Sequence, residues 1–221
     1  MTQIRWSGSA TRRCAGGIVA AVATVAGIPV SVDEVDAREA RLRGGSLAAA
    51  LPIAGTSEGR QLRRWLTQLI VTERVVAAEA AARGVNADDA PAEDELLPDI
   101  TARLEIGSIA AAALADPRAR ALFARVTADV DVSDDAIAAY HERNPLRFAE
   151  SQPDRHGWRA PAANGPPLAQ VRSTIAEHLR AAAQRRAFRV WLDQRRADLV
   201  RLAHGYEHPG DPRQPDNTHR H

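Results

Sequence analysis

The residues best suited to chemistry are four histidines near the end of the chain, His204, His208, His219 and His221. His204 and His208 are four residues apart, so a continuing helix would put both imidazoles on one face, where they could bind zinc or nickel. A flexible tail could bring His219 or His221 in as a third ligand. A glycine and a proline within this stretch oppose the helix, and a polar tail without metal is the alternative. The sequence therefore leaves open either no cofactor or a zinc or nickel ion.

Other clusters of reactive side chains have simpler interpretations. The acidic run at residues 88–95 is typical of a solvated linker, with a cation site as the alternative. Arginine clusters between residues 185 and 196 indicate solvated helix faces, because 29 basic and 28 acidic side chains leave a net charge of only +1, too small for a dedicated nucleic-acid binder. The chain has no glycine-rich phosphate loop, nucleophile elbow or paired-histidine zinc motif. We therefore assign no catalytic residue and do not expect an enzyme.

The composition favours a helical, globular protein. Of the 221 residues, 45% are hydrophobic, which is enough for a core, and only 4% are aromatic, while alanine is abundant. All the basic residues are arginine, as GC-rich codons would produce. The single cysteine, Cys14, excludes an intramolecular disulfide. No apolar run reaches the ~18 residues that a membrane span requires.

The N-terminal region has two interpretations. Residues 15–30 carry no charge and follow Arg12 and Arg13, as in a weak export signal with a small-residue cleavage site at residues 21–23. Alternatively, residues 22–30 form a short buried strand or hairpin with a glycine turn. Cleavage would cut into that strand, so we favour the strand and a cytoplasmic protein, with export as the alternative.

Capping signals and apolar periodicity predict a series of helices. A capping box formed by Ser31 and Glu34 should start a helix that ends near Arg43. The clearest amphipathic pattern covers residues 60–83 and stops at Gly84. Further helices are expected at residues 99–114, 116–126, 133–144 and 168–203. Asp116 is the predicted N-cap of the second of these, with proline at its first position, and Ser133 is the predicted N-cap of the third. Loops or connectors are expected at residues 45–59, 86–98 and 150–167.

Four blocks of this pattern, in order, resemble the SurA-like and PrsA-like chaperone family. Residues 22–35 are similar to its opening strand and acidic-capped helix, although Ala26-Gly27 replaces the Asn-Gly of the family. Residues 60–85 resemble its "QLI-x-x-x-LL-x-x-EA-x-x-x-G-I" helix. Residues 132–148 resemble the "V-(S/T)-D-E-E-(I/V)-x-x-YY-x-x-N-x-x-x-F" segment that precedes its parvulin isomerase module, and residues 167–192 resemble the closing "PF-x-x-V-…-WL" helix that follows it.

The isomerase module itself is missing. Only residues 150–166 lie where it would be inserted, and a folded domain needs at least ~50 residues. His156 and Trp158 in this connector are therefore read as solvated positions. The resemblance implies a mainly α fold in which the long N- and C-terminal helices pack together. It also implies one helical domain at residues 19–204, between a flexible N-terminus (1–18) and a disordered tail (205–221).

The resemblance further implies a non-enzymatic chaperone that binds an unfolded or immature client protein in an apolar groove. An accessory protein for a metalloenzyme, using the histidine tail, is the second hypothesis. We expect neither a nucleic acid nor a membrane as partner, and a homodimer stays open. The candidate groove residues, for which plain core positions are the alternative, are Trp65, Leu69, Tyr140, Phe148, Phe188 and Trp191.

Overall fold

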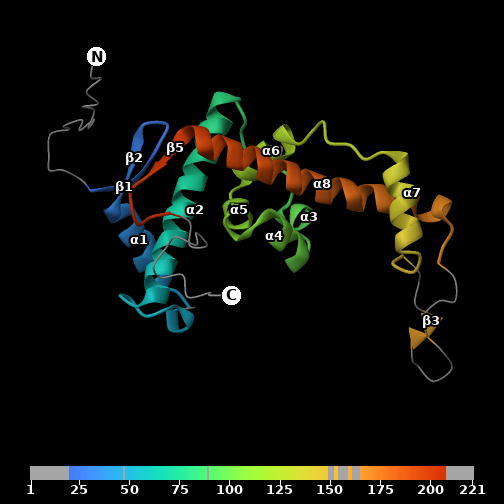
Figure 1. Ribbon diagram of the computed structural model, residues 1–221, viewed down its shortest axis with the longest axis horizontal. Helices are drawn as coiled ribbons and strands as arrows, with labels where there is room; N and C mark the ends of the chain where they lie inside the picture. The colour runs from blue at the N-terminus through green and yellow to red at the C-terminus, as the bar shows by residue number, and fades with distance from the viewer. Residues whose placement is uncertain are drawn as a thin grey trace, which may run out of the picture. The chain divides into compact units, whose positions relative to one another are not determined.

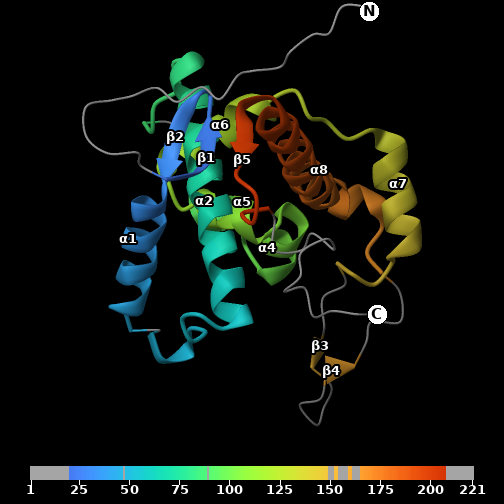
Figure 2. The same ribbon diagram turned by 60° about the vertical axis from the view of Figure 1, so that its left-hand side comes forward.

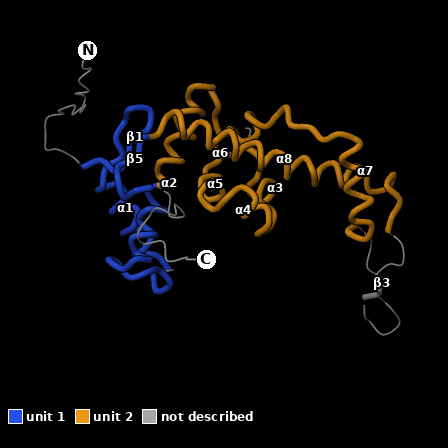
Figure 3. The backbone as a smooth tube through the Cα atoms, in the orientation of Figure 1, with its two compact units in different colours: residues 1–67, 201–221 blue, residues 68–200 orange. Residues whose placement is uncertain are grey.

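The computed structural model describes residues 20–46, 48–88, 90–148, 152–153, 159–160 and 165–207. It is mainly helical with a small three-stranded sheet, which confirms the predicted fold class (Figure 1). The chain divides into two compact units (Figure 3). Unit 1 comprises residues 1–67 and 201–221, and unit 2 comprises residues 68–200. Residues 1–19, which contain Cys14 and the start of the candidate export signal, lie outside the described residues.

Unit 1 opens with the β-hairpin that the sequence predicted. Strand β1 (Ala21–Val25) pairs antiparallel with β2 (Ile28–Ser31). Ala26 and Gly27 form the turn, with φ angles of 50° and 80°. Positive φ at both central residues is typical of the type I′ turn, whose twist matches that of the flanking strands. The buried hairpin side chains, including Val22 and Val30, contribute to the core of this unit.

Helix α1 (Val32–Arg43) follows the hairpin directly and has the predicted capping box. The backbone N–H of Glu34 donates to Ser31 Oγ at 3.2 Å, and the Ser31 N–H donates to Glu34 Oε1 at 3.1 Å. A short 3-10 turn, η1 (Ala48–Ala50), lies in the expected loop before α2 (Ser57–Ala82). Arg63 on α2 pairs with Asp36 at 2.6 Å and with Glu39 at 2.8 Å, so ion pairs join α1 to the part of α2 in unit 1.

A third strand corrects the predicted end of the last helix. We expected that helix to reach about residue 203, but α8 (Leu168–Leu199) stops at Leu199 and the chain continues as β5 (Val200–Leu202). The strand order is β2-β1-β5, and the Ala203 N–H donates to the Val22 carbonyl at 2.9 Å. The free edge of β1 supplies hydrogen-bonding groups that a further helical turn would not, and this pairing ends the helix.

Unit 2 contains the second part of α2 and a group of shorter helices. As predicted, Asp116 caps α6 (Pro117–Val126), with proline at its first position, and Ser133 caps α7 (Asp134–Arg143). Two expectations are corrected. The acidic linker contains a single-turn helix, α3 (Glu93–Leu96). The expected helix at residues 99–114 is broken into α4 (Ile100–Ile106) and α5 (Ser108–Ala113) because Gly107 adopts φ 90°, outside the helical region.

The core of unit 2 forms around the middle of α8. The Phe123 and Phe188 rings lie 5.0 Å apart, and Phe188 is only 1% exposed. The second part of α2 is linked to the end of α8: Arg195 Nε donates to Glu79 Oε1 at 2.8 Å, and Arg196 donates to Gln68. Within unit 2, therefore, side-chain hydrogen bonds link the two long helices.

The connector between α7 and α8 is described only at a few positions. Strands β3 (Gln152–Pro153) and β4 (Arg159–Ala160) pair antiparallel within it. His156 and Trp158 lie outside the described residues. In the part of the chain that the structure describes, no helix is both long enough and apolar enough to cross a membrane.

Candidate peptide-binding site

Helix α7 lies against the first half of α8 (Figure 2). Side chains of the two helices form a small apolar cluster. Ile137 from α7 and Val171 and Ile175 from α8 are its buried centre. The ion pair between Arg180 and Asp131, at 2.9 Å, lies beside this contact. The partly buried hydrophobic residues packed on this centre are Val132, Tyr140, Phe148, Leu168, Ala176 and Leu179.

Three half-buried rings lie together on this cluster, and we call them the aromatic patch: Tyr140, Phe148 and His178. The ring centroids of Tyr140 and Phe148 are 6.3 Å apart, and His178 lies 5.5 Å from Tyr140 and 6.5 Å from Phe148. Tyr140 comes three residues after buried Ile137 on α7, and His178 three residues after buried Ile175 on α8, so both helices present these rings beside their buried stripes. Leu146, in the turn before Phe148, is 48% exposed.

The segments that enter and leave the connector are held together beside the patch. His141 Nε2 lies 2.9 Å from the Pro166 carbonyl oxygen, and Asn144 Nδ2 donates to the Tyr140 carbonyl at 2.9 Å. Gly165 packs directly against Pro145, leaving no space for a side chain. These contacts position the turn that carries Leu146 and Phe148.

The charge state of the patch depends on His178. Burial lowers the pKa of His178, the positive charges of Arg147 and Arg185 lower it further, and the weaker effects of Glu105 and Asp99 oppose the shift. The imidazole is therefore neutral at pH 7. In this state the three rings of the patch are uncharged.

The predicted groove residues fall into separate places. Tyr140 and Phe148 are brought together in the aromatic patch. Leu69 and Phe188 are core side chains, 4% and 1% exposed. Trp191 is half-buried beside Phe188, with ring centroids 5.4 Å apart, and the Arg83 guanidinium lies 5.7 Å from the centre of its ring.

Trp65 is a half-buried residue of α2 within unit 1. The structure adds His178 to the patch, a residue that sequence reasoning missed. The sequence signal that could have found it is its helical spacing from Val171 and Ile175, which are both buried on α8.

The predicted metal ligands are not brought together in the described residues. His204 is exposed in the turn after β5, and His208, His219 and His221 lie outside the described part of the chain. Among the residues whose positions are described, no three histidine, cysteine, aspartate or glutamate side chains form a group that could hold a metal ion.

Several arginines of α8 have intramolecular partners. Arg185 is 6% exposed and donates to Glu105 at 2.8 Å, and Arg189 donates to the Glu105 carbonyl at 3.1 Å. Arg195 pairs with Glu79, as described above. These arginines connect helices within unit 2.

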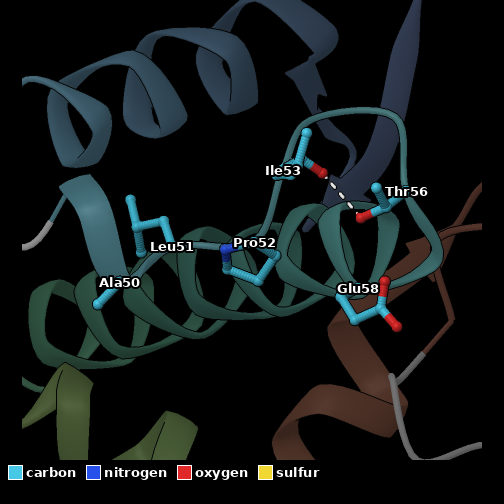
Figure 4. A pocket seen from close by; sticks show the side chains of 6 residues that line it. All are labelled: Ala50, Leu51, Pro52, Ile53, Thr56 and Glu58. Carbon is cyan, nitrogen blue, oxygen red and sulfur yellow. Dashed lines mark hydrogen bonds between the residues drawn. The ribbon is translucent and has the colours of Figure 1, made fainter.

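An open pocket of about 310 Å³ lies in unit 1, between η1 and the start of α2 (Figure 4). Its wall is mostly apolar, formed by Leu51, Pro52 and Ile53, and Thr56 Oγ1 donates to the Ile53 carbonyl at 2.8 Å. Hydrogen bonds from its own backbone N–H and from Ser57 and Thr56 lower the pKa of Glu58. The polar groups of this pocket are thus used to start α2, and we assign no ligand to it.

In comparisons with known proteins, only the N-terminal part of the chain matches a family. Residues 21–58 match a family described as "Family of unknown function (DUF7158)". A search of curated proteins found no match, and neither did a search of solved structures. The matched residues cover the hairpin, α1 and the loop that leads into α2, so this similarity concerns unit 1 and not the aromatic patch.

Proposed function

We propose that this protein is a non-enzymatic, chaperone-like protein that binds extended segments of unfolded or immature client proteins. The single observation that carries this proposal is the aromatic patch, which presents three rings at the surface of the contact between α7 and α8, next to exposed Leu146. Aromatic side chains that remain half-exposed supply large contact areas at little entropic cost, as protein-binding surfaces require.

The expected affinity is modest. An aromatic side chain buries about 150–250 Å² when fully covered, worth about 4–6 kcal/mol at 25 cal/mol per Å². The rings of the patch are already half-buried, so a partner gains only part of this. Ordering an extended peptide costs several kcal/mol. Two or three such anchors therefore support binding in about the micromolar range or weaker, which suits a protein that must release its client.

The sequence resemblance supports the same proposal. The two blocks at residues 132–148 and 167–192 that resemble SurA-like and PrsA-like chaperones are the blocks that build the patch. In that family an isomerase module lies between them. Here the short connector takes that place, and the proposed activity requires contact alone, without turnover of a substrate.

The test is suppression of aggregation of a heated or chemically reduced model client without ATP. The Tyr140→Ala variant should suppress aggregation less well than the wild type, because it removes the ring that contacts both other members of the patch. Val190→Ala is the matched control, since Val190 is a 52% exposed apolar residue of α8 outside the patch.

Thermal unfolding of each variant separates binding from folding. The proposal requires Tyr140→Ala to lose activity at temperatures where it remains folded. A Tyr140→Ala protein that protects the client as well as wild type would contradict the proposal. The proposal would also be contradicted if each variant lost client protection only in proportion to its loss of thermal stability.

A further inference from the structure

The aromatic patch is bordered by two exposed arginines. Arg143 comes three residues after Tyr140, so it lies on the same side of α7, and Arg147 lies between Leu146 and Phe148 in the following turn. Arg143 Nε donates to the Ala139 carbonyl at 3.0 Å. Within the described residues, neither arginine forms an ion pair with a carboxylate, in contrast to Arg185 and Arg195 of α8.

The two carboxylates that act on the pKa of His178, Glu105 and Asp99, already have partners. Glu105 accepts from Arg185 at 2.8 Å, and Asp99 caps α4 by accepting from the Ala102 N–H at 2.8 Å. Glu142 is exposed, but it is two residues after Tyr140, about 200° around the helix. The positive charges of Arg143 and Arg147 are therefore not neutralised by these groups.

The pKa of His178, inside the patch, is affected by the same excess of positive charge. Apart from burial, the strongest influences on its pKa are the positive charges of Arg147 and Arg185, which exceed the opposing effects of Glu105 and Asp99. Around His178, therefore, the arginine charges outweigh the carboxylate charges, although the chain as a whole carries a net charge of only +1.

We infer that the preferred partner of this surface is a peptide segment in which acidic residues flank a large apolar or aromatic side chain. The apolar side chain would pack on the aromatic patch, and the flanking carboxylates would pair with the guanidinium groups of Arg143 and Arg147, whose planar forks suit carboxylate oxygens. This inference rests on the proposed function and specifies the client sequences that it favours.

Three labelled peptides provide the test by fluorescence anisotropy on the full chain. They share one phenylalanine and one leucine, and differ only in flanking residues, which are glutamate, glutamine or lysine. We expect the glutamate peptide to bind about five- to tenfold more tightly than the glutamine peptide and the lysine peptide to bind most weakly. Raising the salt concentration should reduce these differences.

Charge reversal identifies the residues responsible. The Arg147→Glu variant should bind the glutamate peptide more weakly than the wild type does, and the lysine peptide more tightly. The control is Arg118→Glu, which makes the same charge change at an exposed position of α6 in the same unit and should leave the ranking unchanged. The two variants have the same net charge, so a nonspecific charge effect would alter both equally.

The outcomes distinguish a failure of the acidic preference from a failure of the proposed function. Equal binding of all three peptides, or equal effects of the two variants, would overturn the acidic preference while leaving the proposed function intact. Absence of binding for every peptide would contradict both. A single-stranded oligonucleotide that binds more tightly than the glutamate peptide would identify the surface as a nucleic-acid site and overturn the inference.

Discussion

Gly165→Ala should destabilise unit 2 at the place where the connector rejoins the fold. A Cβ atom on residue 165 would lie 2.6 Å from the carbonyl carbon of Pro145 and closer still to its oxygen, whereas real Cβ contacts do not fall below 3.0 Å. The obstacle is backbone, which cannot rotate away as a flexible side chain could. The segments that enter and leave the connector must therefore separate.

The expected loss follows from three contributions. Overpacking of this kind costs about 1–3 kcal/mol. The neighbouring contact between His141 and the Pro166 carbonyl, at 2.9 Å, would weaken, with a further cost of about 1 kcal/mol. Replacing glycine by alanine also reduces the conformational entropy of the unfolded chain, which stabilises the folded protein by about 0.4–1 kcal/mol. The net loss is about 1–3.5 kcal/mol, or several degrees in Tm for a chain of this length.

Urea and thermal unfolding measure this loss, and Gly44→Ala is the matched control. Gly44 ends α1 with φ −84°, and its added Cβ would meet only backbone oxygens at 3.5 and 3.7 Å, which is ordinary contact. The control should be neutral or slightly stabilising. If the two alanine variants unfold at the same urea concentration and temperature, then the close approach of Gly165 to Pro145 does not constrain the connector, and the reasoning is refuted.

Two further predictions concern unit 1. Burial tends to raise the pKa of Glu39, but hydrogen bonds from Arg43 and Arg63 and their charges outweigh it and lower that pKa below the ordinary glutamate value of 4.5. The stabilisation by Glu39 is therefore present above about pH 4.5 and is lost as the pH falls through the lower, folded-state pKa. Urea unfolding at neutral and acidic pH should show that Glu39→Gln costs about 1 kcal/mol at pH 7 and has a smaller effect in acid; an equal effect at both would contradict this account. In the hairpin turn, Ala26 adopts φ 50°, which asparagine tolerates better, so Ala26→Asn should stabilise the protein by about 0.5–1 kcal/mol in the same assay, and a lower stability would argue against the type I′ turn.

Local sequence signals were sufficient where the structure is determined by neighbouring residues. The side chains of Ser31, Asp116 and Ser133 cap the helices whose starts they predicted, because an N-cap needs only the amides of the next turn. Gly107 shows the limit of this reasoning. A single glycine inside an apolar pattern is compatible with a continuous helix, and only the packing of α4 and α5 shows that it breaks one.

Long-range contacts account for what the sequence did not predict. The pattern before residue 200 gives no reason for α8 to stop at Leu199, because the partner of β5 is a strand near the start of the chain. For the candidate site, Tyr140 and Phe148 were predicted from residue type alone. The spacing of His178 placed it on the buried side of α8, but its contact with Tyr140 and Phe148 depends on how α7 lies against α8, which no local pattern specifies.

The pairing of β5 with β1 has a consequence during translation. The hairpin leaves the ribosome early, yet the strand that covers the second edge of β1 is synthesised only after all of unit 2, residues 68–200, which is continuous and can form its own core first. Until then the nascent chain exposes a strand edge, the kind of surface at which chains pair with one another and aggregate. A ribosome that stops before residue 203 would therefore release a product with a formed helical unit and an uncovered sheet edge.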